Sequence, residues 1–330
     1  MSPEQILLGT ILSFFIITAI LGNILVIIAI MTDRNLRKSG NFFLVSLALA
    51  DTFVACFVMT FAMFNDVSGR WQFGPEFCKL WMSADVMCST ASILNLFAIS
   101  LDRYLHIRSP LHYDSWVDHH RVLMVVAAIW LMSALISFLP IQLDWHTLKT
   151  PKTTTSTSYY INNYYNSNNN SLELNPTYAV FSSAISFFIP CIAMTLIYFR
   201  LHQYARRHVI KIKMSNKSSS SSAPLTTTAT AVANNNHTLT TLTTATTTSS
   251  QYKTSDHKAA VTLGIIMGVF LICWAPFFTV NVVGAFCRCV PNLTFGIFTW
   301  LGYVNSTMNP VIYGIFNRQF RDAFQRVIAI

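Results

Sequence analysis

Seven stretches of mostly apolar residues, separated by polar segments, divide this chain. They cover roughly residues 6–31, 41–64, 81–101, 122–143, 178–201, 259–286 and 295–316. Each is long enough to cross a bilayer, because a membrane-spanning helix needs about 20 residues. The first stretch lacks the small-residue cleavage site of a removable signal peptide. The pattern therefore predicts an all-α fold, a bundle of seven transmembrane helices.

Three polar segments fall outside this pattern. Residues 147–171 are rich in Thr, Asn and Tyr, and residues 215–250 in Ser, Thr, Ala and Asn. Neither has apolar periodicity, so we expect both to be disordered. After the last stretch, residues 317–327 place Phe320 and Phe324 one turn apart among several arginines. That spacing predicts a short amphipathic helix on the inner membrane surface.

Composition and charge support a membrane protein. The chain is 53% hydrophobic and only 11% charged, whereas soluble domains carry about 25% charged residues. Its net charge of +9 would suit nucleic acid, but the basic residues flank the apolar stretches, so lipid headgroups are the expected partner. With the amino terminus outside, only five of the 22 Lys and Arg residues face outward. The positive-inside rule therefore predicts an extracellular amino terminus and a cytoplasmic carboxy terminus.

Asp85 lies inside the third apolar stretch. A carboxylate in hydrocarbon costs roughly 2.5–3.5 kcal/mol and is rarely kept without a partner. Ser182, Ser183 and Ser186 lie near the outer end of the fifth stretch. In a regular helix Ser182 and Ser186 share one face and Ser183 is about 100° away. These residues predict a pocket for a small, cationic, hydroxylated ligand, although such serines can instead bond back to their own helix.

Three prolines interrupt the last three apolar stretches. Pro190, Pro276 and Pro310 each remove a hydrogen bond to the carbonyl four residues earlier. We expect these helices to bend beside the pocket and to form the moving part of a switch.

Motifs distributed along the chain resemble those of the rhodopsin-like G-protein-coupled receptors. The resemblance covers Gly22 to Phe324 apart from the two polar tracts. The motifs, in order, are Gly22-Asn23, Leu47-Ala48-Leu49-Ala50-Asp51, Asp102-Arg103-Tyr104, Trp130, Pro190, Cys273-Trp274-Ala275-Pro276 and Asn309-Pro310-Val311-Ile312-Tyr313.

Within that superfamily the chain looks like a receptor for a biogenic amine. The resemblance implies that Asp85 pairs with the ligand ammonium and that Tyr303 holds this carboxylate. It also implies a ligand site completed by Ser89, Ser182, Ser183, Ser186, Trp274, Phe277, Phe278 and Asn281. Aromatic rings there would stack on the amine and support its charge.

Three segments narrow the resemblance further. Residues 85–96 resemble dopamine receptors of the cyclase-stimulating group, and residues 175–180 and 256–261 resemble invertebrate members of that group. Dopamine is therefore the expected ligand. Octopamine, tyramine and serotonin receptors share much of the same frame and remain alternatives.

The resemblance also implies a switch and its partners. Arg103 should pair with Asp102 and with Asp256 at the foot of the sixth helix in the closed state. Residues expected to serve the switch or the G protein are Asp102, Arg103, Tyr104, Pro110, Leu111, Tyr198, Asp256, Asn309, Pro310 and Tyr313. The implied partners are a heterotrimeric G protein, arrestin and a receptor kinase, and the implied location is the plasma membrane.

A sodium ion is the one cofactor-like species that the resemblance implies. The matching residues are Asp51, Ser92, Asn305, Ser306 and Asn309. One carboxylate with neutral oxygen ligands suits a hard cation. The alternative is a hydrated polar network with no ion.

The cysteines depart from the family pattern. In the family, the residue matching Cys78 pairs with a cysteine in the second outer loop, but residues 145–176 contain none. Cys287 and Cys289 could bridge each other, or one of them could pair with Cys78. All three are expected on the oxidising side of the membrane. Asn169 and Asn292 begin glycosylation sequons on that same side.

Two other classes of protein fit the sequence less well. A transporter is disfavoured because there are no internal repeats or paired broken helices. An enzyme is not expected, because the sequence shows no cluster of metal ligands, nucleophile motif or phosphate-binding loop.

Overall fold

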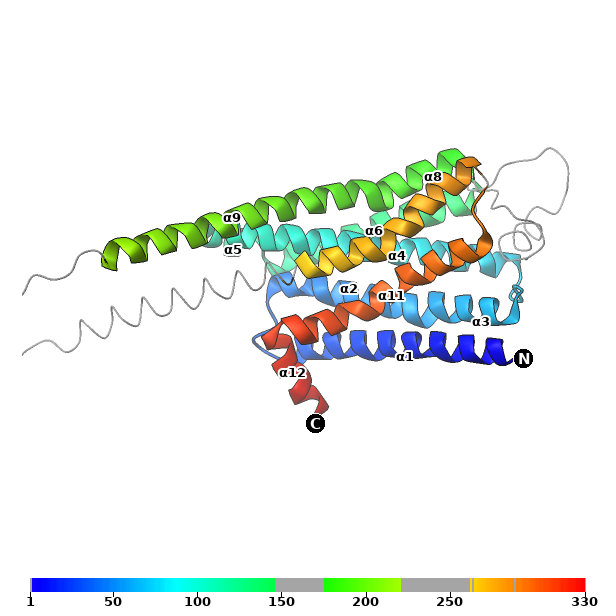
Figure 1. Cartoon of the computed structure of the whole chain (residues 1–330), viewed down its shortest axis with the longest axis horizontal. Helices are drawn as coiled ribbons and strands as arrows, with labels where there is room; N and C mark the ends of the chain where they lie inside the picture. The colour runs from blue at the N-terminus through cyan, green and yellow to red at the C-terminus, as the bar shows by residue number, and fades with distance from the viewer. Residues whose placement is uncertain (1, 146–174, 221–261, 263, 288, 330) are drawn as a thin grey trace, which may run out of the picture.

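The computed structural model describes residues 2–145, 175–220, 262, 264–287 and 289–329. Within these residues the regular structure is helical and contains no strand. The long helices run side by side and form one bundle (Figure 1). The expectation of an all-α bundle of membrane-spanning helices is confirmed.

The helices extend beyond the apolar stretches that predict them. The second is continuous over Ser39–Ser68 and the sixth covers Gly264–Cys287. The labelled elements, of which η1, α2, η2 and α3 together make up the second helix, are α1 (Pro3–Thr32), η1 (Ser39–Asn41), α2 (Phe42–Phe53), η2 (Val54–Met59), α3 (Thr60–Ser68), α4 (Pro75–Arg108), α5 (Pro110–Trp116), α6 (His119–Gln142), α8 (Pro176–Ser183), η3 (Ala184–Phe188), α9 (Ile189–Ser220), α11 (Asn292–Phe316) and α12 (Arg318–Ile328).

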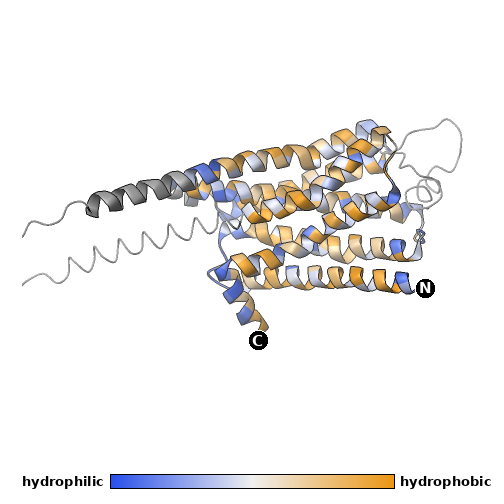
Figure 2. Cartoon of the chain, in the orientation of Figure 1, coloured by the Kyte–Doolittle hydropathy of each residue, from blue (hydrophilic) through white to orange (hydrophobic). Residues whose placement is uncertain are grey.

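Apolar side chains cover the outside of the bundle. Phe14 on α1 and Leu131 on α6 are 66% and 62% exposed, as expected for side chains that face lipid. Hydrophilic residues gather at the ends of the bundle, most densely around α12 (Figure 2). Six described helices are long and apolar enough to cross a membrane by length and composition.

Helix α11 is long enough, at 25 residues, but is more polar than those six. Its polar residues face the interior: Asn305, Ser306, Thr307 and Asn309 are all buried. The polarity that weakens its apolar signal therefore supplies groups to the centre of the bundle.

Helix α4 is the central element, packing against α2, α6 and α9. Two glycines allow α11 to approach its neighbours closely. A Cβ on Gly22 would lie 2.9 Å from the Pro310 ring, and one on Gly302 would lie 2.9 Å from the Trp274 ring. A larger residue at either position would push α11 away from α1 or from the sixth helix.

Two helices contain a π-helical turn. Element η2 lies between α2 and α3, and η3 lies between α8 and α9. A π turn has i→i+5 hydrogen bonds, so it alters which side chains share a face on either side of it. The second of these turns, η3, contains Ser186, one of the expected ligand residues.

The amphipathic helix expected after the seventh span is present as α12. The Asn317 side chain accepts from the backbone N–H groups of Gln319 and Phe320 and so caps its first turn. Phe320 and Ala323 are buried, and Arg326 pairs with Asp33 at the end of α1. The apolar face therefore packs on the bundle, Arg326 ties the helix to α1, and Arg318 and Arg321 are exposed.

The two low-complexity tracts lie largely outside the described residues. This is true of all of 147–171 and of 221–250. Helix α9 continues to Ser220, so the expected disorder is wrong for the beginning of the second tract.

Candidate functional site

Asp85 lies on the third turn of α4 and faces the interior of the bundle. Its Oδ2 accepts a hydrogen bond of 2.9 Å from the Tyr303 hydroxyl, and its Oδ1 accepts one of 3.3 Å from Ser89. Tyr303 is only 1% exposed. Among the described residues no Lys, Arg or His pairs with Asp85. Neutral donors therefore hold the carboxylate in place, and none of the described side chains supplies it with a positive charge.

Three aromatic rings of the sixth helix, those of Trp274, Phe277 and Phe278, pack against one another. Trp274 meets Phe277 edge to face at 5.8 Å, and Phe277 meets Phe278 in the same way at 5.2 Å. Phe187, from η3, stacks on Phe278 with ring centroids 4.4 Å apart and planes within 8° of parallel. Phe187 was missed from the sequence, since an aromatic residue in an apolar stretch does not reveal its partner.

The three serines of the fifth helix are not equivalent. Ser183 and Ser186 are 1% and 3% exposed, whereas Ser182 is only half-buried. The Ser182 hydroxyl donates to the Ala179 carbonyl at 3.4 Å. The Ser183 hydroxyl accepts from the Asn281 amide at 3.1 Å. The Ser186 hydroxyl is buried and has no hydrogen-bond partner among the described residues.

This arrangement corrects the regular-helix geometry assumed for Ser182 and Ser186. The π turn over Ala184–Phe188 includes Ser186, so the spacing of four residues no longer has its α-helical meaning. Ser183 and Ser186 are the two fully buried hydroxyls, and Ser182 is turned toward its own backbone. The sequence alone could not locate this turn.

Arg103 is held at the other end of α4 by two groups. Its Nε lies 3.4 Å from Oδ2 of Asp102, and its Nη2 donates to Oδ1 of Asn41 at 2.7 Å. Asp102 also accepts from the Tyr113 hydroxyl at 2.6 Å. Asn41 and Tyr113 were not identified from the sequence. Asp256, the other expected partner of Arg103, lies outside the described residues.

Several other switch residues lie near this end of the bundle, whereas Asn309 bonds to Asp51 and Pro310 lies against Gly22. Tyr104 meets Tyr204 of α9 edge to face at 6.2 Å, and Tyr313 stacks on Phe320 of α12 at 5.3 Å. The Tyr198 ring lies where a side chain on Gly264 would be. Pro110 and Leu111 begin α5, but their side chains are not described. Pro310 lies inside α11.

Asp51 forms the most complete polar centre of the bundle. Ser92 and Ser306 each donate to its Oδ1 at 3.0 Å, and Asn309 donates to its Oδ2 at 2.7 Å. Asn305 lies in α11 beside Ser306, and its Oδ1 is buried and has no hydrogen-bond partner among the described residues. Three helices therefore converge on one carboxylate through four of the five expected residues, while Asn305 makes no bond to it.

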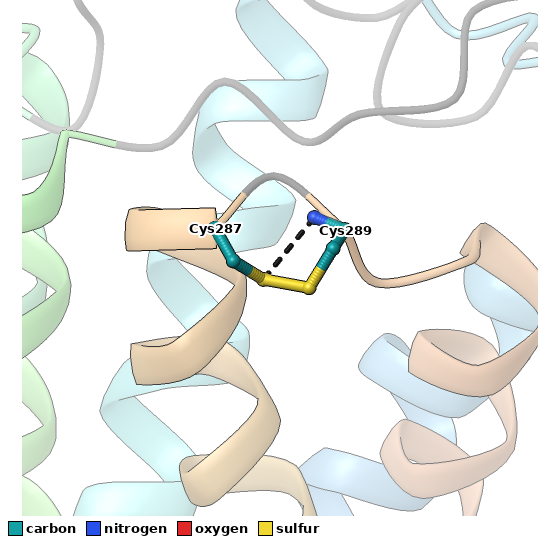
Figure 3. The surroundings of a disulfide bond; sticks show 2 residues. All are labelled: Cys287 and Cys289. Carbon is teal, nitrogen blue, oxygen red and sulfur yellow. Dashed lines mark hydrogen bonds between the residues drawn. A yellow bond between two sulfur atoms is a disulfide. The ribbon is translucent and has the colours of Figure 1, made fainter.

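A disulfide joins Cys287 and Cys289 beyond the end of the sixth helix (Figure 3). The backbone N–H of Cys289 also donates to Sγ of Cys287. Cys78, in the first turn of α4, is a free and buried thiol. Of the two pairings left open by the sequence, the structure contains the local one.

The two sequon asparagines differ. Asn292 is the first residue of α11; its side chain is half-buried and its Oδ1 has no hydrogen-bond partner among the described residues. Asn169 lies outside the described residues.

Comparison with known proteins identifies the family. Residues 22–313 match the family model described as the 7 transmembrane receptor (rhodopsin family). Dopamine receptor 1 of Drosophila melanogaster is 49% identical over 98% of this chain, and the alignment covers 63% of that relative's length. Octopamine receptor beta-1R of Drosophila melanogaster is 41% identical, over 96% of this chain and 60% of the relative.

A vertebrate relative is more distant. The D(1)-like dopamine receptor of Takifugu rubripes is 38% identical, over 98% of this chain and 70% of the relative. The family consists of multi-pass membrane receptors and not of enzymes. The extent of the family match shows that this chain belongs to the rhodopsin family of seven-transmembrane receptors.

Proposed function

We propose that this chain is a receptor for a biogenic amine, with dopamine as the first candidate. The observation that carries the proposal is Asp85, which has two neutral hydrogen-bond donors and no cationic partner among the described residues. An interior carboxylate of this kind is costly unless a positive charge pairs with it. A ligand ammonium would supply that charge, as expected for an amine receptor.

The buried hydroxyls favour a catechol over a plain aromatic ring. Ser186 has a buried hydroxyl without a partner, and Ser183 is held by Asn281. A ligand with two adjacent ring hydroxyls could bond to both serines while its amine reaches Asp85. The resemblance to relatives named dopamine receptors supports the same ligand.

Octopamine is the second candidate, supported by the 41% identity to a relative named an octopamine receptor. Octopamine carries one ring hydroxyl and dopamine carries two. A dependence on both Ser183 and Ser186 would therefore favour dopamine, whereas dependence on a single serine would favour octopamine. Tyramine, which also has one ring hydroxyl, falls with octopamine in this test, and serotonin with its indole ring is a further alternative.

The opposite end of the bundle is proposed to engage a heterotrimeric G protein that stimulates adenylyl cyclase. Arg103 is held there by Asp102 and Asn41 in what we infer is the closed state. Pro110 and Leu111 would contact the G protein, and arrestin and a receptor kinase would use the same end. The excess of basic residues at this end supports a cytoplasmic location for it and an extracellular amino terminus.

A sodium ion fits the centre around Asp51. The hydroxyl oxygens of Ser92 and Ser306 keep lone pairs after donating to Asp51, and Asn305 has a buried, unpartnered Oδ1. One carboxylate with neutral oxygens is a donor set that suits a hard monovalent cation. We propose sodium there as an allosteric ion.

On the outer side of the membrane, we propose glycosylation at Asn169 and Asn292.

The test is a cyclic AMP assay in transfected cells against a panel of dopamine, octopamine, tyramine, serotonin and phenethylamine. Dopamine should raise cyclic AMP at the lowest concentration. Wild type should be compared with Asp85→Asn at equal surface expression. A response to octopamine at lower concentration than dopamine would overturn the choice of ligand, and a response that survives Asp85→Asn unchanged would overturn the site.

A further inference from the structure

Helix α3 ends near the end of the bundle where the amino terminus is found (Figure 1). Asp66 is in the last turns of α3, beyond the level of the Asp85 site. Its Oδ2 accepts a hydrogen bond of 2.7 Å from the indole N–H of Trp300, and its Oδ1 accepts one of 3.2 Å from the Asn65 amide. Within the described part of the chain it forms no ion pair.

Trp300 connects this carboxylate to the amine site. It precedes Tyr303 by three residues on α11, so the two side chains lie on the same face one turn apart. Their rings meet edge to face, with centroids 5.5 Å apart and planes at 86°. Tyr303 in turn donates its hydroxyl to Oδ2 of Asp85. A continuous series of contacts thus joins Asp66 to Asp85.

Each step in this series restricts the next side chain. A hydrogen bond to an ionised acceptor is stronger and more directional than a neutral one. The bond from Trp300 to Asp66 therefore selects one orientation of the indole ring. That ring forms one side of the space available to the buried Tyr303 ring, whose hydroxyl must point at Asp85.

We propose that Asp66 is a positioning residue for the amine site. Through Trp300 it fixes the orientation of Tyr303, and through Tyr303 it fixes the carboxylate that receives the ligand ammonium. The inference rests on the proposed function, because it assumes that Asp85 binds the amine. It requires no contact between Asp66 and the ligand.

Two other roles would also explain an acidic residue at this place. Asp66 could attract a cationic ligand by its charge, or it could only stabilise the helix packing between α3 and α11. The geometry favours positioning, because both carboxylate oxygens are already engaged by neutral donors and one of those donors touches Tyr303.

The experiment uses the full-length receptor and a radiolabelled amine antagonist. Asp66→Leu removes the acceptor, Asp66→Asn removes the charge but keeps a carbonyl oxygen, and Trp300→Phe removes the indole N–H but keeps an aromatic ring. Each is made in the natural background and together with Tyr303→Phe. Surface expression is measured by antibody labelling, independently of ligand.

We expect Asp66→Leu and Trp300→Phe to weaken antagonist binding by about tenfold, the effect of losing one hydrogen bond. Asp66→Asn should retain most of the affinity. With Tyr303→Phe present, the further loss from Asp66→Leu should shrink to within about twofold, because residues that act in series are not additive.

Three results would overturn the proposal. Natural affinity in both Asp66→Leu and Trp300→Phe would show that the series has no effect. Equal losses in Asp66→Asn and Asp66→Leu would show a direct action of charge. Equal losses with and without Tyr303→Phe would show a packing role. If Asp66→Leu folds too poorly to reach the cell surface, the same comparisons of antagonist affinity, with and without Tyr303→Phe, are made with Asp66→Asn and Trp300→Phe.

Asp85→Asn, measured in parallel, separates this inference from the proposed function. Loss of binding in Asp85→Asn with natural affinity in the Asp66 and Trp300 variants would sink the positioning role alone. Natural affinity in Asp85→Asn would sink the proposed amine site itself.

Discussion

Asp51 and Asp85 are two interior carboxylates of this receptor, and their surroundings stabilise them in different ways. Asp51 is completely buried and accepts hydrogen bonds from Ser92, Ser306 and Asn309. Asp85 is less buried and accepts only from Ser89 and Tyr303. The bundle encloses the first completely and leaves the second partly exposed.

The difference supports our proposal that Asp85 is the carboxylate that pairs with the ligand. Three donors from two neighbouring helices compensate Asp51 for most of the hydration that it loses. Asp85 has a weaker set of donors and no cation among the described residues. We therefore expect substitution of Asp85 to act on amine binding and substitution of Asp51 to act on the response to ions.

The largest effect is expected for Asp85→Asn. The amide keeps the shape and still accepts from Tyr303, but it cannot pair with an ammonium. Loss of one partner of a buried charge pair costs about 3–5 kcal/mol, or roughly a hundredfold or more in affinity. Saturation binding of a radiolabelled amine antagonist measures it, with cell-surface labelling as the control for folding. Binding that matches the natural receptor would remove the distinction between the two carboxylates.

A smaller effect is expected at the hydroxyls that accompany Asp85. Replacing both Ser183 and Ser186 by Ala should weaken dopamine by about tenfold, at roughly 0.5–1.5 kcal/mol for each hydrogen bond. Ser182→Ala is the matched control, since that hydroxyl already bonds to Ala179. Competition binding should show little loss for phenethylamine, which has no ring hydroxyls. Equal losses for both amines would mean that the serines only support the helix.

Asp51→Asn tests the other side of the comparison. The substitution should change amine antagonist affinity by less than about threefold, because pairing with the ligand ammonium is assigned to Asp85 and lost charge at Asp51 affects no such contact. Sodium should lower agonist affinity in the natural receptor and have no effect in the variant. Agonist competition with sodium or with N-methyl-D-glucamine measures this. A sodium effect that persists in Asp51→Asn would place the ion elsewhere.

The smallest effect concerns a third carboxylate, Asp102, which unlike the other two has a cationic neighbour in Arg103. Asn41→Ala removes the second group that holds Arg103. With one hydrogen bond fewer in the closed state, basal cyclic AMP should rise by about twofold to threefold, since Asp102 still pairs with Arg103. Asn41→Asp, which keeps an acceptor, is the control. A basal level that does not change in Asn41→Ala would show that Asp102 alone is sufficient.

Much of the fold was predictable because its signals are local. A run of apolar residues is itself the physical condition for crossing a bilayer, so the all-α bundle followed from the sequence. Helix α12 followed from the one-turn spacing of Phe320 and Phe324. The expected disorder was wrong at the beginning of the 215–250 tract, because α9 extends to Ser220.

The family and the unusual position of Asp85 were also determined by the sequence alone. A carboxylate inside an apolar stretch is conspicuous whatever surrounds it, and ordered motifs on successive spans identify the family without coordinates. The serines were found in the same way, as a cluster of hydroxyls near one helix end.

Only the tertiary structure decided which of these groups meet. Tyr303 and Asp85 are 218 residues apart, and Trp300 and Asp66 are 234 apart. Such contacts depend on how each helix is rotated about its axis, which the apolar pattern defines too loosely. The π turn over Ala184–Phe188 shows the same limit, because one altered turn redirects Ser186 relative to Ser182 and leaves no mark in the residue pattern.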